Sequence, residues 1–162
     1  MQTIKSNNNM AKQTITIRPA TKKDSKVFLS LINALADYEK LKRPTASATK
    51  RLLEDGFGKK KRFDSFLAFV EGVPVGYAIT FETYSSFLAK PTLYLEDIFI
   101  LPEYRRLGIG KKFFSLLLKE AKKRKCGRIE WTVLDWNQLA IDFYNKLGAN
   151  HMKEWLLYRI VL

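Results

Sequence analysis

The sequence is poor in the side chains that bind metal ions or form disulfides, because its 162 residues include one cysteine, Cys126, and one histidine, His151. A single cysteine excludes an internal disulfide, and these two side chains are too few for a zinc site. They also offer no persuasive pair of nucleophile and base for covalent catalysis. We therefore expect neither a bound metal nor triad chemistry.

Long hydrophobic runs are also missing. Charged residues interrupt every apolar stretch well before the roughly 18 residues that a membrane span requires. Residues 1–12 contain Lys5 and Lys12 but lack the apolar centre of a secretory signal, and residues 6–9 are polar. We predict a disordered leader over 1–12, one domain over 13–162, no membrane partner and a cytoplasmic location.

Acidic residues are scarce, with 16 Asp and Glu against 29 Lys and Arg and a formal net charge of +13. Two basic runs, 59–62 and 122–125, account for part of the excess. A nucleic-acid binder concentrates such charge on one face among aromatic residues, whereas a cofactor enzyme places part of it around phosphates. No nucleic-acid module is recognisable. We therefore keep a basic nucleic-acid-binding module as the alternative to an enzyme.

Hydrophobic periodicity and turn residues predict the order βααβββαβαβ. The expected strands are 14–17, 66–71, 75–83, 93–101, 128–134 and 155–162, and the expected helices are 21–41, 47–56, 108–125 and 137–147. Gly56 is expected to end the second helix in a left-handed conformation. The nearly continuous apolar run 93–101 predicts a strand that is buried on both faces.

A glycine turn, Arg105-Arg106-Leu107-Gly108-Ile109-Gly110-Lys111, connects this buried strand to the third expected helix. Amides at a helix N-terminus point together and attract anions, and glycine lets a diphosphate approach the backbone closely. The spacing lacks the third glycine of the dinucleotide fingerprint. Taken alone, the motif is either a phosphate cradle or an ordinary strand-to-helix turn.

Two adjacent carboxylates, Glu96 and Asp97, interrupt the buried strand. Burying them unpaired would cost several kcal/mol. Adjacent strand residues point to opposite faces, so only one of the two can face a given cleft unless a bulge intervenes. Such a carboxylate can bind a cationic amine and remove its proton, or it can form a structural salt bridge. Tyr144, on the fourth expected helix, is by itself typical of a core aromatic.

These motifs together resemble the GNAT acyltransferase superfamily, and within it the spermidine/spermine N-acetyltransferase branch, whose relatives acetylate diamines or thialysine. The resemblance covers nearly everything from Met10 onward. It rests on residues 17–21, 38–39, 52–58, 93–97, 104–105, 108–110, 136–137, 143–144 and 148–149. Residues 53–58 and 94–97 are specific to the branch.

The resemblance implies an α/β (α+β) fold in which four helices flank a mixed, mostly antiparallel sheet of six to seven strands. This sheet is splayed between strands 4 and 5, with coenzyme A in the opening. The implied activity is acetyl-CoA-dependent acetylation of a primary amine on a polyamine, diamine or thialysine-like molecule, by direct transfer in a ternary complex. An amino acid or a protein lysine is the alternative acceptor. The branch forms homodimers whose C-terminal strands pack across the two-fold axis.

The resemblance also assigns residues. The cofactor side comprises Ile98, Phe99, Ile100, Arg105, Arg106, Leu107, Gly108, Ile109, Gly110, Lys111, Asn137 and Tyr144. Glu96 is the candidate base through water, Tyr144 is the acid that protonates the departing thiolate, and an amide near Ile98 stabilises the oxyanion. The candidates for binding the acceptor are Tyr38, Glu39, Glu96, Asp97 and Glu154. The branch differs from this sequence around 71–74 and 153–155, which leaves the identity of the amine open.

Overall fold

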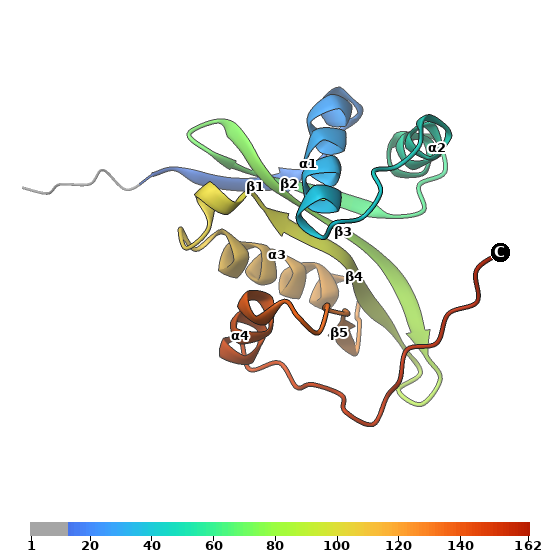
Figure 1. Cartoon of the computed structure of the whole chain (residues 1–162). Helices are drawn as coiled ribbons and strands as arrows, with labels where there is room; N and C mark the ends of the chain where they lie inside the picture. The colour runs from blue at the N-terminus through green and yellow to red at the C-terminus, as the bar shows by residue number, and fades with distance from the viewer. Residues whose placement is uncertain (1–12) are drawn as a thin grey trace, which may run out of the picture. The chain divides into compact units, whose positions relative to one another are not determined.

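The computed structural model describes residues 13–162, so the expected leader lies outside the described part of the chain. The chain divides into two compact units, one reaching Trp131 and the other spanning Thr132–Leu162. The first unit contains a five-stranded sheet and three α-helices, and the second contains one α-helix and an irregular tail (Figure 1).

The sheet has the strand order β1-β2-β3-β4-β5. Its strands are β1 (Ile15–Pro19), β2 (Asp64–Val70), β3 (Val73–Ser85), β4 (Lys90–Ile100) and β5 (Arg128–Glu130). The first four strands pair antiparallel with their neighbours, and β5 runs parallel to β4. Glu71 and Gly72 join β2 to β3 with φ values of 48° and 80°, as in the two-residue turns that match strand twist.

The α-helices are α1 (Ser25–Tyr38), α2 (Ala46–Phe57), α3 (Ile109–Lys123) and α4 (Gln138–Lys146), and the short 3-10 helices are η1 (Lys22–Asp24) and η2 (Pro102–Tyr104). In the first unit, α1 and α2 cover one face of the sheet and α3 covers the other (Figure 1). Phe28 and Leu31 on α1 pack against Leu67, Tyr77 and Phe99 of the sheet. Among residues 13–162, no helix is long and apolar enough to cross a membrane.

The expected buried strand is present as β4, which lies between these two helical layers. Leu93, Leu95 and Phe99 are at most 4% exposed. On the α3 side, Phe113 and Leu117 are fully buried. The prediction of a strand covered on both faces is therefore confirmed.

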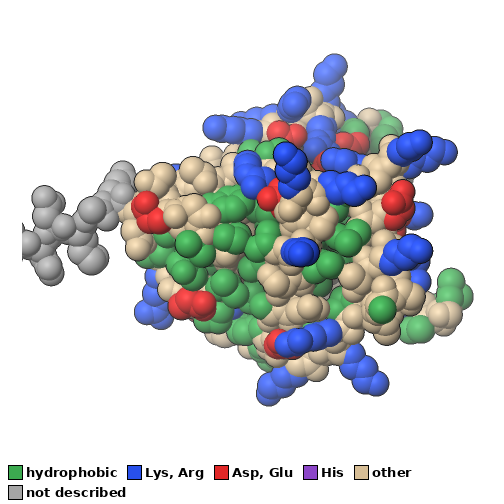
Figure 2. All heavy atoms as spheres, turned by 90° about the horizontal axis from the view of Figure 1, so that it is seen from above, with side chains coloured by type: hydrophobic (Ala, Val, Ile, Leu, Met, Phe, Trp, Pro, Cys, Tyr) green, Lys and Arg blue, Asp and Glu red, His purple; other side chains and the backbone are tan. Residues whose placement is uncertain are grey.

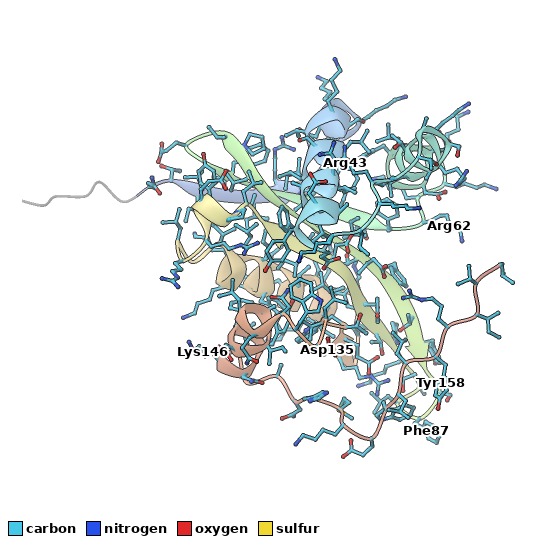
Figure 3. All side chains as sticks on the ribbon, in the orientation of Figure 1. Arg43, Arg62, Phe87, Asp135, Lys146 and Tyr158 are labelled. Carbon is cyan, nitrogen blue, oxygen red and sulfur yellow. The ribbon has the colours of Figure 1, made fainter. Side chains whose placement is uncertain are left out.

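The strand count is lower than predicted, because the sheet of the described chain has five strands rather than six or seven. Residues 155–162 are irregular, and Tyr158 is 85% exposed and projects from the tail (Figure 3). An apolar run favours a strand, but a strand exists only where its backbone groups pair with another strand. Residues 155–162 have no such partner within the described chain, and 128–134 pairs only as far as Glu130.

The end of α2 also differs from the prediction. The helix continues through Gly56 to Phe57, and Gly58 follows with a φ of −77°, which is not left-handed. A Cβ atom at Gly56 would lie 2.8 Å from the Phe63 ring. Gly56 is therefore required for close packing inside the helix, and its assignment as a left-handed cap was wrong.

The excess of lysine and arginine over acidic residues is visible on the surface. Figure 2 shows many Lys and Arg side chains and few Asp and Glu on the face seen from above. The whole basic run 59–62 is exposed. Most of the positive charge is thus in contact with solvent.

Candidate active site

A β-bulge interrupts β4 at the acidic pair. Asp97 lies opposite Ile79 and Leu95 lies opposite Thr80, so Glu96 is an extra residue between two ladder positions. A bulge can direct two consecutive side chains toward the same side of a strand. The negative charge of Glu96 is one of the causes that raise the pKa of Asp97, so the two carboxyl groups interact.

Asp97 has a defined partner on the neighbouring strand. The buried Tyr77 hydroxyl donates a hydrogen bond of 3.2 Å to Asp97 Oδ2. Burial, followed by repulsion from Glu96, raises the pKa of Asp97 to about 6, and Glu39 adds a smaller contribution. The hydrogen bond from Tyr77 opposes this rise because it stabilises the ionised carboxylate.

The C-terminal end of α1 brings a third carboxylate toward this pair. Glu39 follows directly after α1, and burial raises its pKa. Burial raises the pKa of Tyr77, and the charges of Asp97, Glu39 and Glu96 raise it further. Three of the predicted acceptor-binding carboxylates therefore form one interacting group, which we call the acidic cluster (Glu39, Glu96 and Asp97).

Tyr38, the last residue of α1, is held by the glycine turn. The Arg105 guanidinium lies 4.5 Å from the centroid of the Tyr38 ring and 5.8 Å from that of Phe99. Arg105 Nε also donates a 3.0 Å hydrogen bond to the Ile100 carbonyl. Arg105, predicted to bind phosphate, thus connects the glycine turn to the residue next to Glu39.

The glycine turn contains a left-handed backbone position, at Gly108, that glycine adopts at low cost. Gly108 has a φ of 83°, and a Cβ atom added there would meet nothing within 4 Å. The first helical hydrogen bond of α3 runs from the Lys112 amide to the Gly108 carbonyl at 3.1 Å. The amides of the preceding first turn, Ile109, Gly110 and Lys111, are therefore placed to bind an anion.

The neighbouring edge of β4 is open over half its length. Strand β5 pairs with β4 only at Thr92, Leu93 and Tyr94. Beyond this point, Leu95–Ile100 pairs with β3 on one side except at the bulged Glu96, and it has no strand partner in the described chain on the other side. This arrangement agrees with the predicted splay between strands 4 and 5, and it leaves backbone groups for a ligand to bind.

The second unit contains the other predicted residues, and it is described by itself. Asn137 is the N-cap of α4, where its side-chain oxygen accepts a 3.3 Å hydrogen bond from the Ala140 amide. Tyr144 is half-buried 5.6 Å from the Phe143 ring, and burial raises its pKa to about 12. Glu154 is exposed in the tail.

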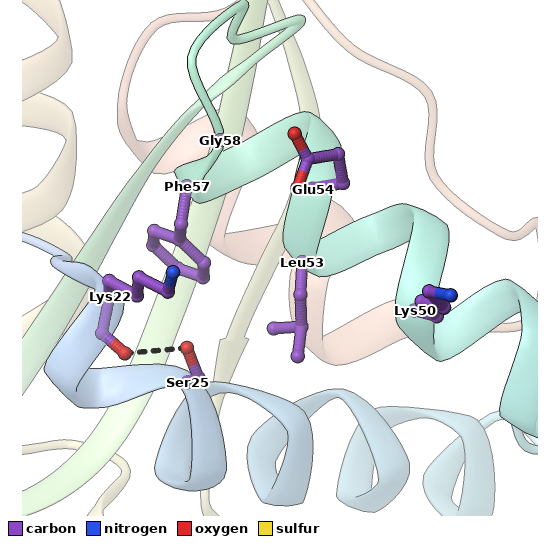
Figure 4. A pocket seen from close by; sticks show the side chains of 7 residues that line it. All are labelled: Lys22, Ser25, Lys50, Leu53, Glu54, Phe57 and Gly58. Carbon is purple, nitrogen blue, oxygen red and sulfur yellow. Dashed lines mark hydrogen bonds between the residues drawn. The ribbon is translucent and has the colours of Figure 1, made fainter.

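A surface hollow lies between η1 and α2 in the first unit. Its lining residues are Lys22, Ser25, Lys50, Leu53, Glu54, Phe57 and Gly58 (Figure 4). Leu53 and Phe57 also pack against the hydrophobic core, and Ser25 donates a hydrogen bond to the Lys22 carbonyl. None of the predicted site residues lines it, so we interpret it as a gap in helix packing.

Comparison with known proteins identifies the fold and the chemistry. Residues 29–149 match the acetyltransferase (GNAT) family. The chain belongs to the GNAT family. This GNAT protein is therefore an acyltransferase, and GNAT acetyltransferases use acetyl-CoA as the acetyl donor.

Two curated relatives of this GNAT protein are acetyltransferases of small amines. The thialysine N-epsilon-acetyltransferase of Bos taurus is 35% identical over 156 residues, which cover 90% of this chain and 91% of that protein. The L-ornithine N5-acetyltransferase NATA1 of Arabidopsis thaliana is 48% identical over 88 residues, which cover 54% of this chain and 39% of that protein.

A solved structure of an aminoglycoside N-acetyltransferase, AAC(6')-Iy in complex with CoA, shares the fold of this GNAT protein. Its TM-score is 0.76 at 21% identity, covering 91% of this chain and 95% of that chain. The predicted fold class is thus confirmed, apart from the number of strands.

Sequence reasoning missed Tyr77 and the contact between Arg105 and Tyr38. Tyr77 lies in an apolar strand, where it is typical of a core residue. The available signal was its position on the strand next to the acidic pair, but the bulge that sets the register cannot be read from the sequence.

Proposed function

We propose that this protein transfers the acetyl group of acetyl-CoA to a primary amine of a small diamine, polyamine or thialysine-like molecule. The observation that carries the proposal is the acidic cluster, which concentrates negative charge in a chain whose net charge is +13. A cationic amine needs such local complementarity. The thialysine and ornithine acetyltransferases among the relatives support an acceptor of this kind.

On the donor side, the proposal uses the glycine turn and the open edge of β4. The backbone of Ile98–Ile100 would hold the pantetheine arm, and residues 105–111 would hold the pyrophosphate. The free first-turn amides of α3 and the positive φ of Gly108 suit a diphosphate that approaches the backbone. We also propose roles in donor binding for Asn137 and Tyr144, as the resemblance implies.

The chemical step is proposed to be direct transfer in a ternary complex. An alkylamine with a pKa of about 10.4 must lose its proton first, which costs about 4.6 kcal/mol at pH 7. Glu96 would accept that proton through water, and the amine nitrogen would then attack the thioester carbon. An amide near Ile98 would stabilise the oxyanion, and Tyr144 would protonate the thiolate that departs as the carbon–sulfur bond breaks. The nitrogen must also lose a second proton to become an amide, and that proton would return through water to the Tyr144 phenolate.

The test is acetyl-CoA turnover, followed by release of the CoA thiol, against thialysine, ornithine, diamines, polyamines, lysine and basic peptides. We expect turnover with small amines, and a kcat/KM reduced by about 10²-fold or more in Glu96→Gln. Glu103→Gln, an exposed carboxylate beyond β4, is the matched control and should retain the parent rate. Turnover confined to peptides would favour the protein-lysine alternative, and no turnover of any amine would refute the proposal.

A second candidate function is nucleic-acid binding, which the exposed basic run 59–62 favours. Such binding would weaken steeply with salt because it releases counterions. A filter-binding assay at physiological salt separates the two functions. Tight binding that coenzyme A does not affect would favour this second candidate.

We also propose that the enzyme is a homodimer. The support is the resemblance to a branch of dimeric enzymes and the apolar tail 155–162, whose large hydrophobic side chains are at least 73% exposed. Exposed apolar patches of this kind mark interaction sites.

A further inference from the structure

Tyr77 occupies a rigid position beneath the acidic cluster. The residue is fully buried, and its ring packs edge-on against Phe28 with centroids 5.6 Å apart. A second ring, Phe99, lies 6.5 Å away on β4. These contacts aim the hydroxyl group out of the aromatic packing and at Asp97 Oδ2, 3.2 Å away.

Asp97 stands among groups that oppose its ionisation. Glu96 on β4 and Glu39 at the end of α1 repel its negative charge, and burial removes water from it. Arg105 is engaged with the Tyr38 ring and the Ile100 carbonyl, and it is not among the causes that shift the pKa of Asp97. Among the causes that shift the pKa of Asp97, the hydrogen bond from Tyr77 is the one that favours the charged form.

We propose that Tyr77 is a positioning residue that fixes the Asp97 carboxylate, in its ionised form, to bind the ammonium group of the acceptor. This inference rests on the proposed amine acetyltransferase function. It adds a residue on β3 to the site, and it assigns different roles to the two adjacent carboxylates. Asp97 holds the cation from a fixed position, whereas Glu96, the exposed residue of the bulge, is left to accept the proton.

A purely structural role for Tyr77 predicts a different behaviour. If the hydroxyl group only satisfies a buried polar atom, Tyr77→Phe lowers the melting temperature and leaves the pH dependence of turnover unchanged. If Tyr77 positions Asp97, the same change removes the interaction that lowers the pKa of Asp97. The acid limb of kcat/KM for the amine must then move to higher pH.

The size of this shift follows from the strength of a hydrogen bond to a charged group, which corresponds to about one pKa unit. A rise from about 6 to about 7 lowers the ionised fraction of Asp97 about fivefold at pH 6 and about twofold at pH 7. Above about pH 8.5 the two enzymes should have nearly the same kcat/KM. The amine itself does not titrate in this range, because its pKa is about 10.4.

The experiment compares pH profiles of kcat/KM, from pH 5 to 9, for the parent enzyme, Tyr77→Phe and the control Tyr94→Phe. Tyr94 is a partly buried tyrosine on β4 that packs against Phe81 with ring centroids 5.2 Å apart. We expect the acid limb to move up by about one unit in Tyr77→Phe only. An unmoved limb in folded Tyr77→Phe, or an equal shift in Tyr94→Phe, would overturn the inference.

Asp97→Asn keeps the inference testable if Tyr77→Phe does not fold. The proposal requires this variant to lose the acid limb near pH 6 and to bind the amine at least about tenfold more weakly. An acid limb that persists at the same pH in Asp97→Asn would overturn it. Failure of the parent enzyme to acetylate any amine would instead refute the proposed function, so the two failures are distinguishable.

Discussion

Tyr144 is the residue whose proposed role separates catalysis from packing most clearly. Its ring lies beside Phe143 on α4, and its raised pKa keeps the phenol protonated at neutral pH. A protonated phenol is what a departing thiolate needs as a proton donor. The same half-buried environment also suits a tyrosine that only packs.

We expect Tyr144→Phe to lower single-turnover acetyl transfer by about 10²–10⁴-fold, because the change deletes the acid and keeps the ring. The melting temperature and the affinity for acetyl-CoA should remain nearly unchanged. Rapid quench under single-turnover conditions is the measurement, because slow product release can hide a slower chemical step. Tyr158→Phe, at a highly exposed tyrosine of the tail, is the control. A rate within about threefold of the parent would assign the proton to water instead.

At the scale of residues, the sequence was sufficient to select Glu96 and Asp97, because burying two adjacent unpaired carboxylates in an apolar strand is costly. It was not sufficient to find Tyr77. The contact between Tyr77 and Asp97 depends on the pairing of β3 with β4 and on the bulge at Glu96. Both are long-range features that no local pattern encodes.

At the scale of elements, the N-terminus of α3 offers a test with a matched control. Gly108 and Gly72 have φ values of 83° and 80°, and an added Cβ atom would meet nothing within 4 Å at either. Alanine should therefore cost about 1–2 kcal/mol of unfolding free energy at both positions, through the backbone alone. Gly72 lies in the hairpin between β2 and β3, away from the glycine turn.

Only Gly108→Ala should weaken the binding of coenzyme A, by about tenfold or more. The reason is that the new methyl group occupies space where the diphosphate is proposed to lie. Isothermal titration calorimetry with coenzyme A measures this, and thermal denaturation checks that the two variants lose similar stability. Equal affinities in Gly108→Ala and Gly72→Ala would remove the glycine turn from the donor site.

Elements were predictable where the signal is local. Hydrophobic periodicity and turn residues predicted α1, α3, α4 and the first hairpin. The tail was mispredicted because an apolar sequence sets the preference for a strand, whereas a partner strand elsewhere decides whether it forms. The conformation of Gly56 was mispredicted because a glycine is needed there to make room for the ring of Phe63, which lies beyond the helix.

At the scale of the whole molecule, net charge and local charge have opposite signs. A net charge of +13 attracts the anionic donor and repels a polycationic acceptor at long range. The acidic cluster acts at short range, where salt screens it less because Glu39 and Asp97 are partly buried. Preference for a polyamine must therefore arise from Glu39, Glu96 and Asp97 rather than from the overall field.

The exposed tail makes self-association a property of the whole molecule that can be measured directly. Apolar side chains between Trp155 and Leu162 remain in water, and a second copy of the chain could cover them. Phe87, at the tip of the hairpin between β3 and β4, is an equally exposed apolar side chain outside the tail (Figure 3).

We expect light scattering at micromolar concentration to give about twice the chain mass of 18.8 kDa. Replacing Leu157 and Ile160 by aspartate should shift the mass to that of the monomer, because burying the new charges in an interface would cost several kcal/mol. Phe87→Asp is the matched control and should remain dimeric. A parent enzyme that stays at 18.8 kDa would refute the proposed homodimer. A dimer that survives the double substitution would place the interface elsewhere on the chain.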